Sequence, residues 1–183
     1  MTRLDAVLGD LTRQHVDAIV NAANSALLGG GGVDGAIHRA GGPDVYAECL
    51  ELRRTAWRDG LPCGLAAATT AGRMPARWVI HTVGPRYGRH AGLEPELLAS
   101  CHSASLDVAR ELGARTVAFP AISCGGFGYP PEEAAPVAVG TVRSYVEEHP
   151  GAFDEVRFVL AAESVLGPFA EALRRVGRRG SRG

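Results

Sequence analysis

The chain has 183 residues, 46% of them hydrophobic, and a formal net charge of −1 at pH 7. This length and composition predict one globular domain rather than a disordered chain, and the balanced charge gives no overall attraction to nucleic acid. No apolar run approaches the about 20 residues that span a bilayer, and residues 1–6 lack the hydrophobic region of a secretory signal, so we expect no membrane partner.

Short apolar runs and helical patterns alternate from the first residues onward. Residues 4–8 and 17–20 predict two strands, and residues 33–40 predict a helix that follows four consecutive glycines. Pro43 suits the first position of a second helix. Two further strands are predicted at the end of this half, over residues 64–70 and 77–83.

The second half continues the alternation. Residues 93–112 carry apolar side chains with a 3.6-residue period and predict an amphipathic helix that Gly113 ends. The continuous apolar run at residues 116–122 is typical of a strand buried on both faces. The next helix extends to about residue 148, and we place its start near residue 132 or 133 so that Pro136 falls in the first turn.

The last predicted elements are a strand at residues 155–161 and a helix at residues 168–176. Strands that alternate with helices along one chain predict a three-layer α/β/α domain. The segment 174–183 is rich in arginine and glycine, which favours solvated disorder over a nucleic-acid-binding arm. We therefore predict a domain over residues 1–173 and a basic tail over residues 174–183.

The cysteines are scattered and form no C-x-x-C pair. Such spacing is typical neither of a zinc site nor of a disulfide framework, and it predicts reduced thiols, no metal and a cytoplasmic location. The four cysteines are Cys49, Cys63, Cys101 and Cys124.

Two glycine-rich loops each follow an apolar strand and precede a helix. The first contains residues 29–32, and Asp34 and His38 follow it one helical turn apart. The second contains Gly125, Gly126 and Gly128. A loop in this position directs backbone N–H groups and the positive end of a helix at an anion, usually a phosphate. Two such loops favour a diphosphate. The purely structural alternatives are a mobile surface loop for residues 29–32 and a tight turn for Gly125, Gly126 and Gly128.

Four motifs together resemble the macro domain family, in particular its MacroD-type branch of ADP-ribose hydrolases. They are Gly9-Asp10-Leu11-Thr12, the stretch from Asn21 to Gly41, the stretch from Trp78 to Pro85, and the stretch from Ala118 to Pro130. Their order and separations agree with the family over residues 3–173. The resemblance implies a mixed, about six-stranded sheet and an ADP-ribose ligand that crosses the carboxyl ends of its strands.

The resemblance also assigns binding residues. It implies that Asp10 accepts a hydrogen bond from adenine beside the backbone of Leu11, whereas by itself Asp10 fits a turn into Thr12. It implies that Phe127 lies against the distal ribose. The backbone groups implied to hold the two phosphates are Gly31, Gly32 and Val33 in the first loop, and Ser123, Cys124, Gly125, Gly126 and Phe127 in the second.

The same resemblance also assigns catalytic residues. It implies that Asn24 contacts the distal ribose, that Asn21 is structural, and that Asp34 activates a water molecule. His38 would hydrogen-bond Asp34 or the ribose. The structural alternatives are an N-cap or first-turn Asp34 that stabilises the helix dipole, and simple packing for His38.

This chain departs from the family pattern at three places. Cys124 stands where the family has threonine, and Gly126 stands where it has a β-branched residue. Residues 159–162 lack the aromatic side chain that many relatives stack on adenine.

These observations predict a cofactor-independent hydrolase. The resemblance implies that it removes mono-ADP-ribose from acidic side chains of proteins and deacetylates O-acetyl-ADP-ribose. Free nucleic acid is not an expected partner, while ADP-ribosylated nucleic acid remains open. One alternative is a reader module that binds ADP-ribose without turnover. A second is a thiol hydrolase with Cys124 as nucleophile, which lacks an evident His or Asp partner.

Overall fold

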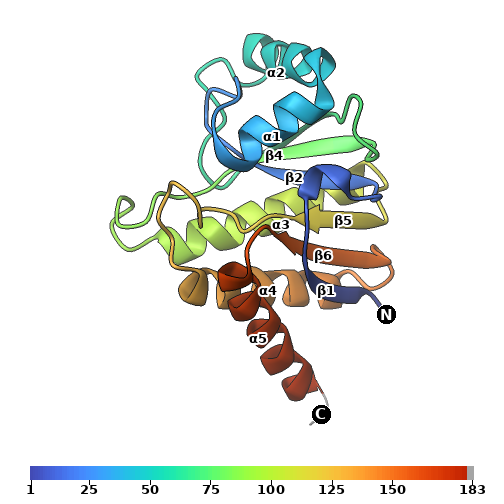
Figure 1. The fold of residues 1–183 in the computed structure, drawn as a ribbon, viewed down its shortest axis with the longest axis vertical. Helices are drawn as coiled ribbons and strands as arrows, with labels where there is room; N and C mark the ends of the chain where they lie inside the picture. The colour runs from blue at the N-terminus through green and yellow to red at the C-terminus, as the bar shows by residue number, and fades with distance from the viewer. Residues whose placement is uncertain (181–183) are drawn as a thin grey trace.

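The computed structural model describes residues 1–180, which fold into a six-stranded sheet with helices on both faces (Figure 1). Neighbouring strands run parallel except β3, which is antiparallel to β4. The spatial order of the strands is β1-β6-β5-β2-β4-β3. The predicted mixed, six-stranded sheet is confirmed. In chain order the strands are β1 (Arg3–Leu8), β2 (Ala18–Ala23), β3 (Ala66–Thr70), β4 (Trp78–Val83), β5 (Thr116–Phe119) and β6 (Glu155–Leu160).

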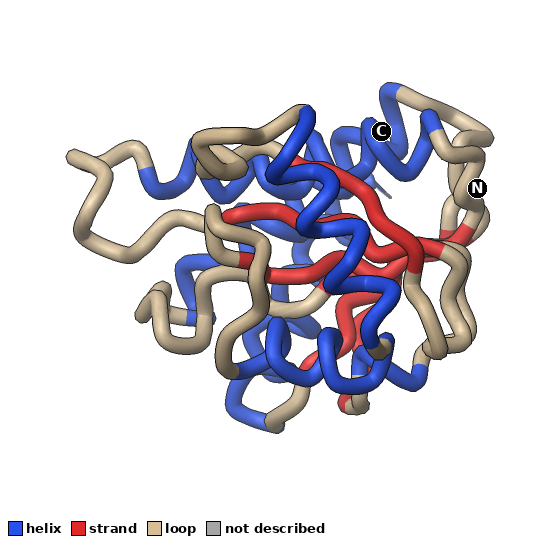
Figure 2. Tube along the Cα trace, turned by 90° about the horizontal axis from the view of Figure 1, so that it is seen from above, coloured by secondary structure: helices blue, strands red, loops and turns tan. Residues whose placement is uncertain are grey.

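The helices form two layers, which confirms the three-layer architecture (Figures 1 and 2). One layer contains the short 3-10 helix η1 (Leu11–Arg13), α1 (Gly32–Gly41) and α2 (Pro43–Thr55). The other contains α3 (Glu94–Glu111), α4 (Pro131–Glu148) and α5 (Glu163–Gly180). Gly113 follows α3 in the left-handed conformation, with φ +74°, and so ends that helix as predicted.

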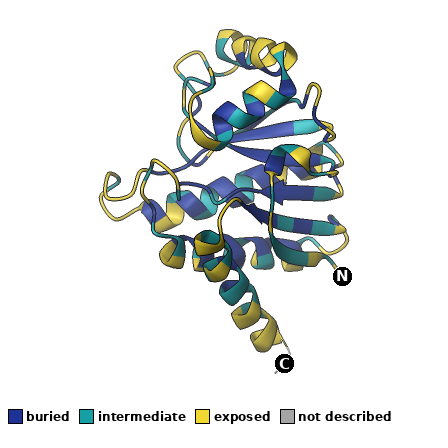
Figure 3. Cartoon of the chain, in the orientation of Figure 1, coloured by how far each residue is buried: buried dark blue, intermediate teal, exposed yellow. Residues whose placement is uncertain are grey.

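The strands in the middle of the sheet are buried on both faces (Figure 3). Successive side chains alternate between the two layers: Ile19 of β2 packs with Ile37 of α1, whereas Val20 joins the core formed with Leu98 of α3. The same alternation places Asn21, two residues after Ile19, on the α1 side of β2. This face of the sheet therefore carries polar side chains into the interior.

Two strands end three residues away from the predicted position. β2 extends to Ala23 rather than residue 20, and it pairs with β4 at each of its six positions. β5 ends at Phe119 rather than residue 122. Pro120 has no N–H group to donate to the sheet, so the chain leaves the strand there.

The prolines of the last helices lie further inside them than predicted. α4 begins at Pro131, so Pro136 is its sixth residue and lies beyond the first turn, where we had placed it. α5 begins at Glu163 rather than residue 168, and Pro168 lies inside it. Packing of both helices against the sheet and against each other outweighs the hydrogen bond that each proline removes.

The disorder predicted for residues 174–180 is wrong. α5 continues through them to Gly180. Leu173 and Val176 pack against the core of the sheet, and Arg174 and Arg175 both pair with Glu171. The arginine- and glycine-rich composition of this segment concealed the apolar contacts of Leu173 and Val176. Residues 181–183 of the predicted tail lie outside the described residues. No helix within residues 1–180 is long and apolar enough to cross a membrane.

Two histidines are buried in the core. Burial lowers the pKa of His81 to about 3 and that of His102 to about 4, from an ordinary value of 6.5. Both rings are therefore neutral in the folded protein at pH values where the unfolded chain protonates them. Since the unfolded state then binds more protons, acidification below pH 6.5 favours unfolding.

We expect the free energy of unfolding to fall between pH 6.5 and pH 5, by up to about 1.4 kcal/mol per pH unit for each buried histidine. Urea unfolding followed by circular dichroism at several pH values measures this slope. His102→Gln removes one of the two histidines, so it should lower this slope by up to about 1.4 kcal/mol per pH unit, whatever its effect on the free energy of unfolding at pH 7. An unfolding free energy that stays constant from pH 6.5 to pH 5 would contradict the expectation.

Candidate functional site

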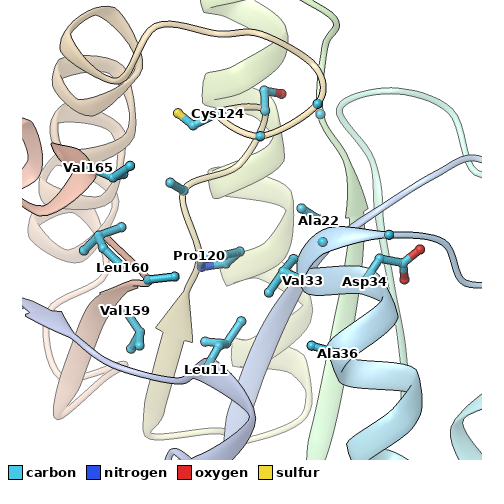
Figure 4. A pocket seen from close by; sticks show the side chains of 18 of the residues that line it. Leu11, Ala22, Val33, Asp34, Ala36, Pro120, Cys124, Val159, Leu160 and Val165 are labelled. Atoms are coloured by element: carbon cyan, nitrogen blue, oxygen red, sulfur yellow. The ribbon is translucent and has the colours of Figure 1, made fainter. Parts of the chain in front are cut away.

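A cleft of about 840 Å³ opens at the carboxyl ends of the parallel strands (Figure 4). Its walls come from the segments that follow β1, β2, β4, β5 and β6. β2 and β5 are neighbours in the sheet, but the chain leaves β2 for α1 on one face and leaves β5 for α4 on the other. Such a divergence leaves a crevice where open α/β sheets bind their ligands.

The first glycine loop is held by the side chain of Asn24. Its Nδ2 donates to the carbonyl oxygen of Gly29 at 2.9 Å, and its Oδ1 accepts from the N–H of Leu27 at 3.1 Å. α1 then begins at Gly32, with φ +58° and open space where a Cβ would be. The N–H groups of Gly32 and Val33 have no intrahelical partner and lie in the wall of the cleft, which suits an anion.

The second glycine loop leaves four N–H groups free. In this loop the N–H groups of Ser123, Gly125, Gly126 and Phe127 donate to no acceptor within residues 1–180. The N–H of Cys124, by contrast, donates to the carbonyl oxygen of Ala121 at 3.2 Å. The buried Oγ of Ser123 also lacks a partner. All five residues line the cleft, so this loop offers several donors to a second anionic group.

Phe127 lies at the edge of this loop. The guanidinium carbon of Arg86 stands 4.4 Å from the centre of its ring. One face of Phe127 is therefore covered by a cation, and the residue also contributes to the cleft. The ring is part of the wall rather than of the core.

One end of the cleft is aliphatic. The side chains of Leu11, Val159, Leu160 and Val165 lie there (Figure 4). They come from η1, β6 and the start of α5. This end suits a flat apolar group.

Asp10 lies at the same part of the cleft lining. Its Oδ1 accepts hydrogen bonds from the backbone N–H of Thr12 at 2.9 Å and from the Thr12 hydroxyl at 2.7 Å. These two bonds, the hydroxyl first, lower the pKa of Asp10 and keep it ionised. The turn interpretation of Asp10 is thus correct for one oxygen, while the other oxygen makes no hydrogen bond within residues 1–180.

Asp34 is buried in the first turn of α1 and lines the cleft (Figure 4). Its Oδ1 accepts from Nδ2 of Asn21 at 2.8 Å. Its carboxylate bonds to no helix N–H group, and the N-cap of α1 is Gly31. Asp34 is therefore not the N-cap, but its position in the first turn fits the alternative in which it stabilises the helix dipole. Its Oδ2 faces Gly30 and accepts no hydrogen bond within residues 1–180.

His38 does not line the cleft. Its Nε2 lies 3.5 Å from Oδ1 of Asp34 and makes no hydrogen bond. Its ring packs against Gly29 and meets the ring of Tyr46 edge-on. His38 thus stands behind Asp34, where direct contact with a ligand is not expected.

Cys124 has a poorly reactive thiol. Burial, and to a smaller extent the negative charge of Glu132, raise its pKa to about 11. The thiolate is the nucleophilic form of cysteine, and it is scarce at neutral pH for such a group. The thiol-hydrolase alternative therefore loses its chemical basis.

Sequence reasoning missed several residues of the wall. Gly84 follows β4, and a Cβ there would collide with Oγ of Ser123. The signal was present, since Gly84-Pro85 directly follows a buried strand. Asn21 and His81 do not line the wall, but they connect to Asp34 behind it. Both stand in the motifs, and nothing in the sequence indicated this connection. The other wall residues without a sequence-based assignment are Gly9, Thr12, Ala22, Ala23, Gly30, Ala36, Pro120, Ala121, Val159, Leu160, Ala161, Ala162 and Val165.

The fold and the cleft define a class of protein: an α/β domain in which two loops present free N–H groups to one elongated anionic ligand. A family profile described as Macro domain matches residues 20–138. The chain belongs to the macro domain family, which confirms the resemblance of its motifs at the level of the family.

Individual relatives agree with this assignment. The macro domain-containing protein in the sno 5′ region of Streptomyces nogalater is 57% identical over 173 residues, which are 94% of this chain and 93% of that protein. The solved Oceanobacillus iheyensis macrodomain with ADP is 38% identical, with a TM-score of 0.91 over 95% of this chain and 91% of that one. The Trypanosoma brucei macrodomain in complex with ADP-ribose is 38% identical, with a TM-score of 0.82 over 92% of this chain and 68% of that one.

The raised pKa of Cys124 predicts slow alkylation. With iodoacetamide at pH 7.4 we expect Cys124 to react more slowly than a free cysteine, and its rate to rise steadily between pH 8 and pH 10.5. Mass spectrometry of the peptide that contains Cys124 measures the rate. Fast alkylation at neutral pH, with a plateau below pH 8, would restore the thiol as a candidate nucleophile.

Proposed function

We propose that the protein binds ADP-ribose in this cleft and hydrolyses ester-linked mono-ADP-ribose, as an ADP-ribosyl hydrolase of the MacroD type. Its substrates are mono-ADP-ribosylated Asp or Glu side chains of proteins, and O-acetyl-ADP-ribose. The observation that carries the proposal is the buried carboxylate of Asp34, which stands directly after the first phosphate loop with Oδ2 unpaired within residues 1–180.

The shape of the cleft supports ADP-ribose as the ligand. The two sets of free N–H groups suit the two phosphates, and the aliphatic end suits the adenine ring. Oδ2 of Asp10, which lies 3.9 Å from Nε of Arg13, accepts a hydrogen bond from the exocyclic amino group of adenine. The distal ribose then lies toward Asn24, Asp34 and Phe127. The solved relatives that contain ADP and ADP-ribose support the same choice.

The chemistry follows from Asp34. Oδ1 is held by Asn21, so the unpaired Oδ2 is the oxygen that orients a water molecule and takes its proton. Attack of that water on the ester at the distal ribose releases ADP-ribose and the free carboxylic acid of the acceptor. A pyrophosphate oxygen of the substrate helps to hold the water. The loop N–H groups fix the diphosphate and stabilise charge, which is catalysis by orientation and electrostatics.

Binding should depend on open space in the second loop. Gly125 has no atom within 4 Å of the position of a Cβ, and its backbone is not left-handed. Gly125→Glu therefore folds but places a carboxylate among the phosphate donors. We expect ADP-ribose binding, micromolar in the wild type and about −8 kcal/mol, to weaken beyond detection by calorimetry.

Gly177→Glu is the matched control, because its Cβ also meets open space and lies on the exposed side of α5 outside the cleft. It should bind ADP-ribose like the wild type. AMP should bind the wild type more weakly than ADP-ribose, because it has one phosphate for two loops. Normal binding by Gly125→Glu would remove the second loop from the site.

Turnover should depend on the carboxylate of Asp34. Asp34→Asn can still accept a hydrogen bond from Asn21 but cannot take a proton. We expect the release of ADP-ribose from a Glu-linked mono-ADP-ribosylated protein to slow by about 10²-fold or more, with ADP-ribose affinity nearly unchanged. Chromatography of free ADP-ribose measures the rate.

Asp44→Asn is the matched control, because Asp44 occupies the first turn of α2 and is exposed outside the cleft. It should keep normal turnover. A wild-type rate in Asp34→Asn would remove Asp34 from the chemistry. A wild-type protein that binds ADP-ribose but releases none from any ester substrate would favour the reader alternative.

A further inference from the structure

A chain of buried polar side chains runs from Asp34 away from the cleft to the edge strand of the sheet. Asn21 of β2, His81 of β4 and Thr69 of β3 are 0%, 0% and 2% exposed. Nδ2 of Asn21 lies 2.8 Å from Oδ1 of Asp34 and 3.1 Å from Nδ1 of His81. Nε2 of His81 lies 2.9 Å from Oγ1 of Thr69. None of these three side chains lines the cleft.

The direction of every hydrogen bond in this chain is set from its far end. The hydroxyl of Thr69 donates its one proton to the carbonyl oxygen of Thr70 at 3.0 Å. Thr69 must then accept from His81, so Nε2 of His81 carries the proton and Nδ1 is the acceptor. Since Nδ1 accepts, the amide group that faces it must be the NH₂ of Asn21.

The same NH₂ group has a second proton, and that proton points at Oδ1 of Asp34. A reversed Asn21 amide would place its carbonyl oxygen against both the lone pair of His81 Nδ1 and the carboxylate of Asp34. Both contacts would be repulsive in a buried site, where a polar group without a partner is costly. The observed orientation leaves Oδ1 of Asn21 without a partner within residues 1–180, but it avoids both repulsive contacts. The amide therefore keeps its NH₂ toward the carboxylate.

The other groups that face His81 fit this arrangement. Sγ of Cys49, from α2, lies 3.7 Å from Nε2, and burial raises the pKa of this thiol to about 12. The ring of His38, from α1, lies 6.4 Å from the ring of His81 between centres. Burial and the proximity of His38 lower the pKa of His81, so its ring stays neutral and only one of its nitrogens carries a proton.

We infer that His81 and Thr69 are positioning residues for Asp34: they hold the Asn21 amide with its NH₂ toward the carboxylate, so that Oδ1 is anchored and Oδ2 is presented to the cleft. This inference rests on the proposed hydrolase function. The hydrogen-bond direction itself rests on the geometry alone and is measurable without turnover.

The direction is tested on the wild-type protein with ¹⁵N-labelled histidine. Nuclear magnetic resonance reports which ring nitrogen of His81 carries the proton. We expect protonated Nε2 and bare Nδ1 at pH 7, with no second proton down to pH 5. A protonated Nδ1, or a doubly protonated ring at pH 6, would overturn the inference whether or not the protein is a hydrolase.

The consequence for turnover is tested with Thr69→Val, which removes the hydroxyl and keeps the shape. The His81 proton then loses its acceptor, and the Asn21 amide is free to reverse. We expect kcat to fall on the order of tenfold, as for a displaced reacting group, while ADP-ribose affinity stays within about twofold.

Two controls separate positioning from general stability. Thr69→Ser restores the hydroxyl and should rescue kcat. Thr82→Val removes another buried hydroxyl, from β4, which donates to the carbonyl oxygen of Leu65 at 2.8 Å, and it should leave kcat and ADP-ribose affinity unchanged. Equal loss of kcat in Thr82→Val and Thr69→Val, or a wild-type kcat in Thr69→Val, would overturn the positioning role. A wild type without turnover would instead reject the proposed hydrolase and leave the nuclear magnetic resonance result to decide the geometry.

Discussion

The short seam between β2 and β5 is the constraint on which the site depends. The two strands pair at only two positions, Ala18 with Val117 and Ile19 with Ala118. Before these positions Asp17 fastens them together: its carboxylate accepts from the N–H groups of Arg115 at 2.7 Å and Thr116 at 3.1 Å, and its own N–H donates to the Thr116 hydroxyl at 2.8 Å. After them the strands are free to separate, and the cleft occupies the gap.

β2 and β5 continue differently beyond this seam. β5 ends at Phe119 because Pro120 cannot continue the ladder, so its chain turns at once into the second glycine loop. β2 stays paired with β4 for all six positions and carries Asn21 deep into the layer beneath α1. One wall of the cleft therefore consists of loop backbone with free N–H groups. The other combines the first glycine loop with a fully paired strand whose Asn21 holds the carboxylate of Asp34, so the proposed proton transfer lies on this second wall.

Much of this arrangement was predictable, and what was not has a common cause. The succession of strands and helices along the chain followed from local periodicity, and the two glycine loops followed from glycines placed between strand and helix. The helical course of residues 174–180 did not, because the burial of Leu173 and Val176 is a tertiary contact that an Arg- and Gly-rich composition conceals. The environment of Asp34 did not either. Its partner Asn21 is 13 residues away, and His81 lies 60 residues beyond Asn21.

The two-position seam has a mechanical consequence. The two halves of the sheet, β1-β6-β5 and β2-β4-β3, meet where β2 and β5 pair at two positions, and they separate toward the carboxyl end where the cleft opens. A diphosphate bound as proposed would contact the loops of both halves. Its binding would then suppress local opening between them by a free energy that rises with the logarithm of ligand concentration over dissociation constant. Amide hydrogens around β2 and β5 should therefore exchange with solvent more slowly when the diphosphate is bound, because the ligand then joins the two halves of the sheet as well as filling the cleft.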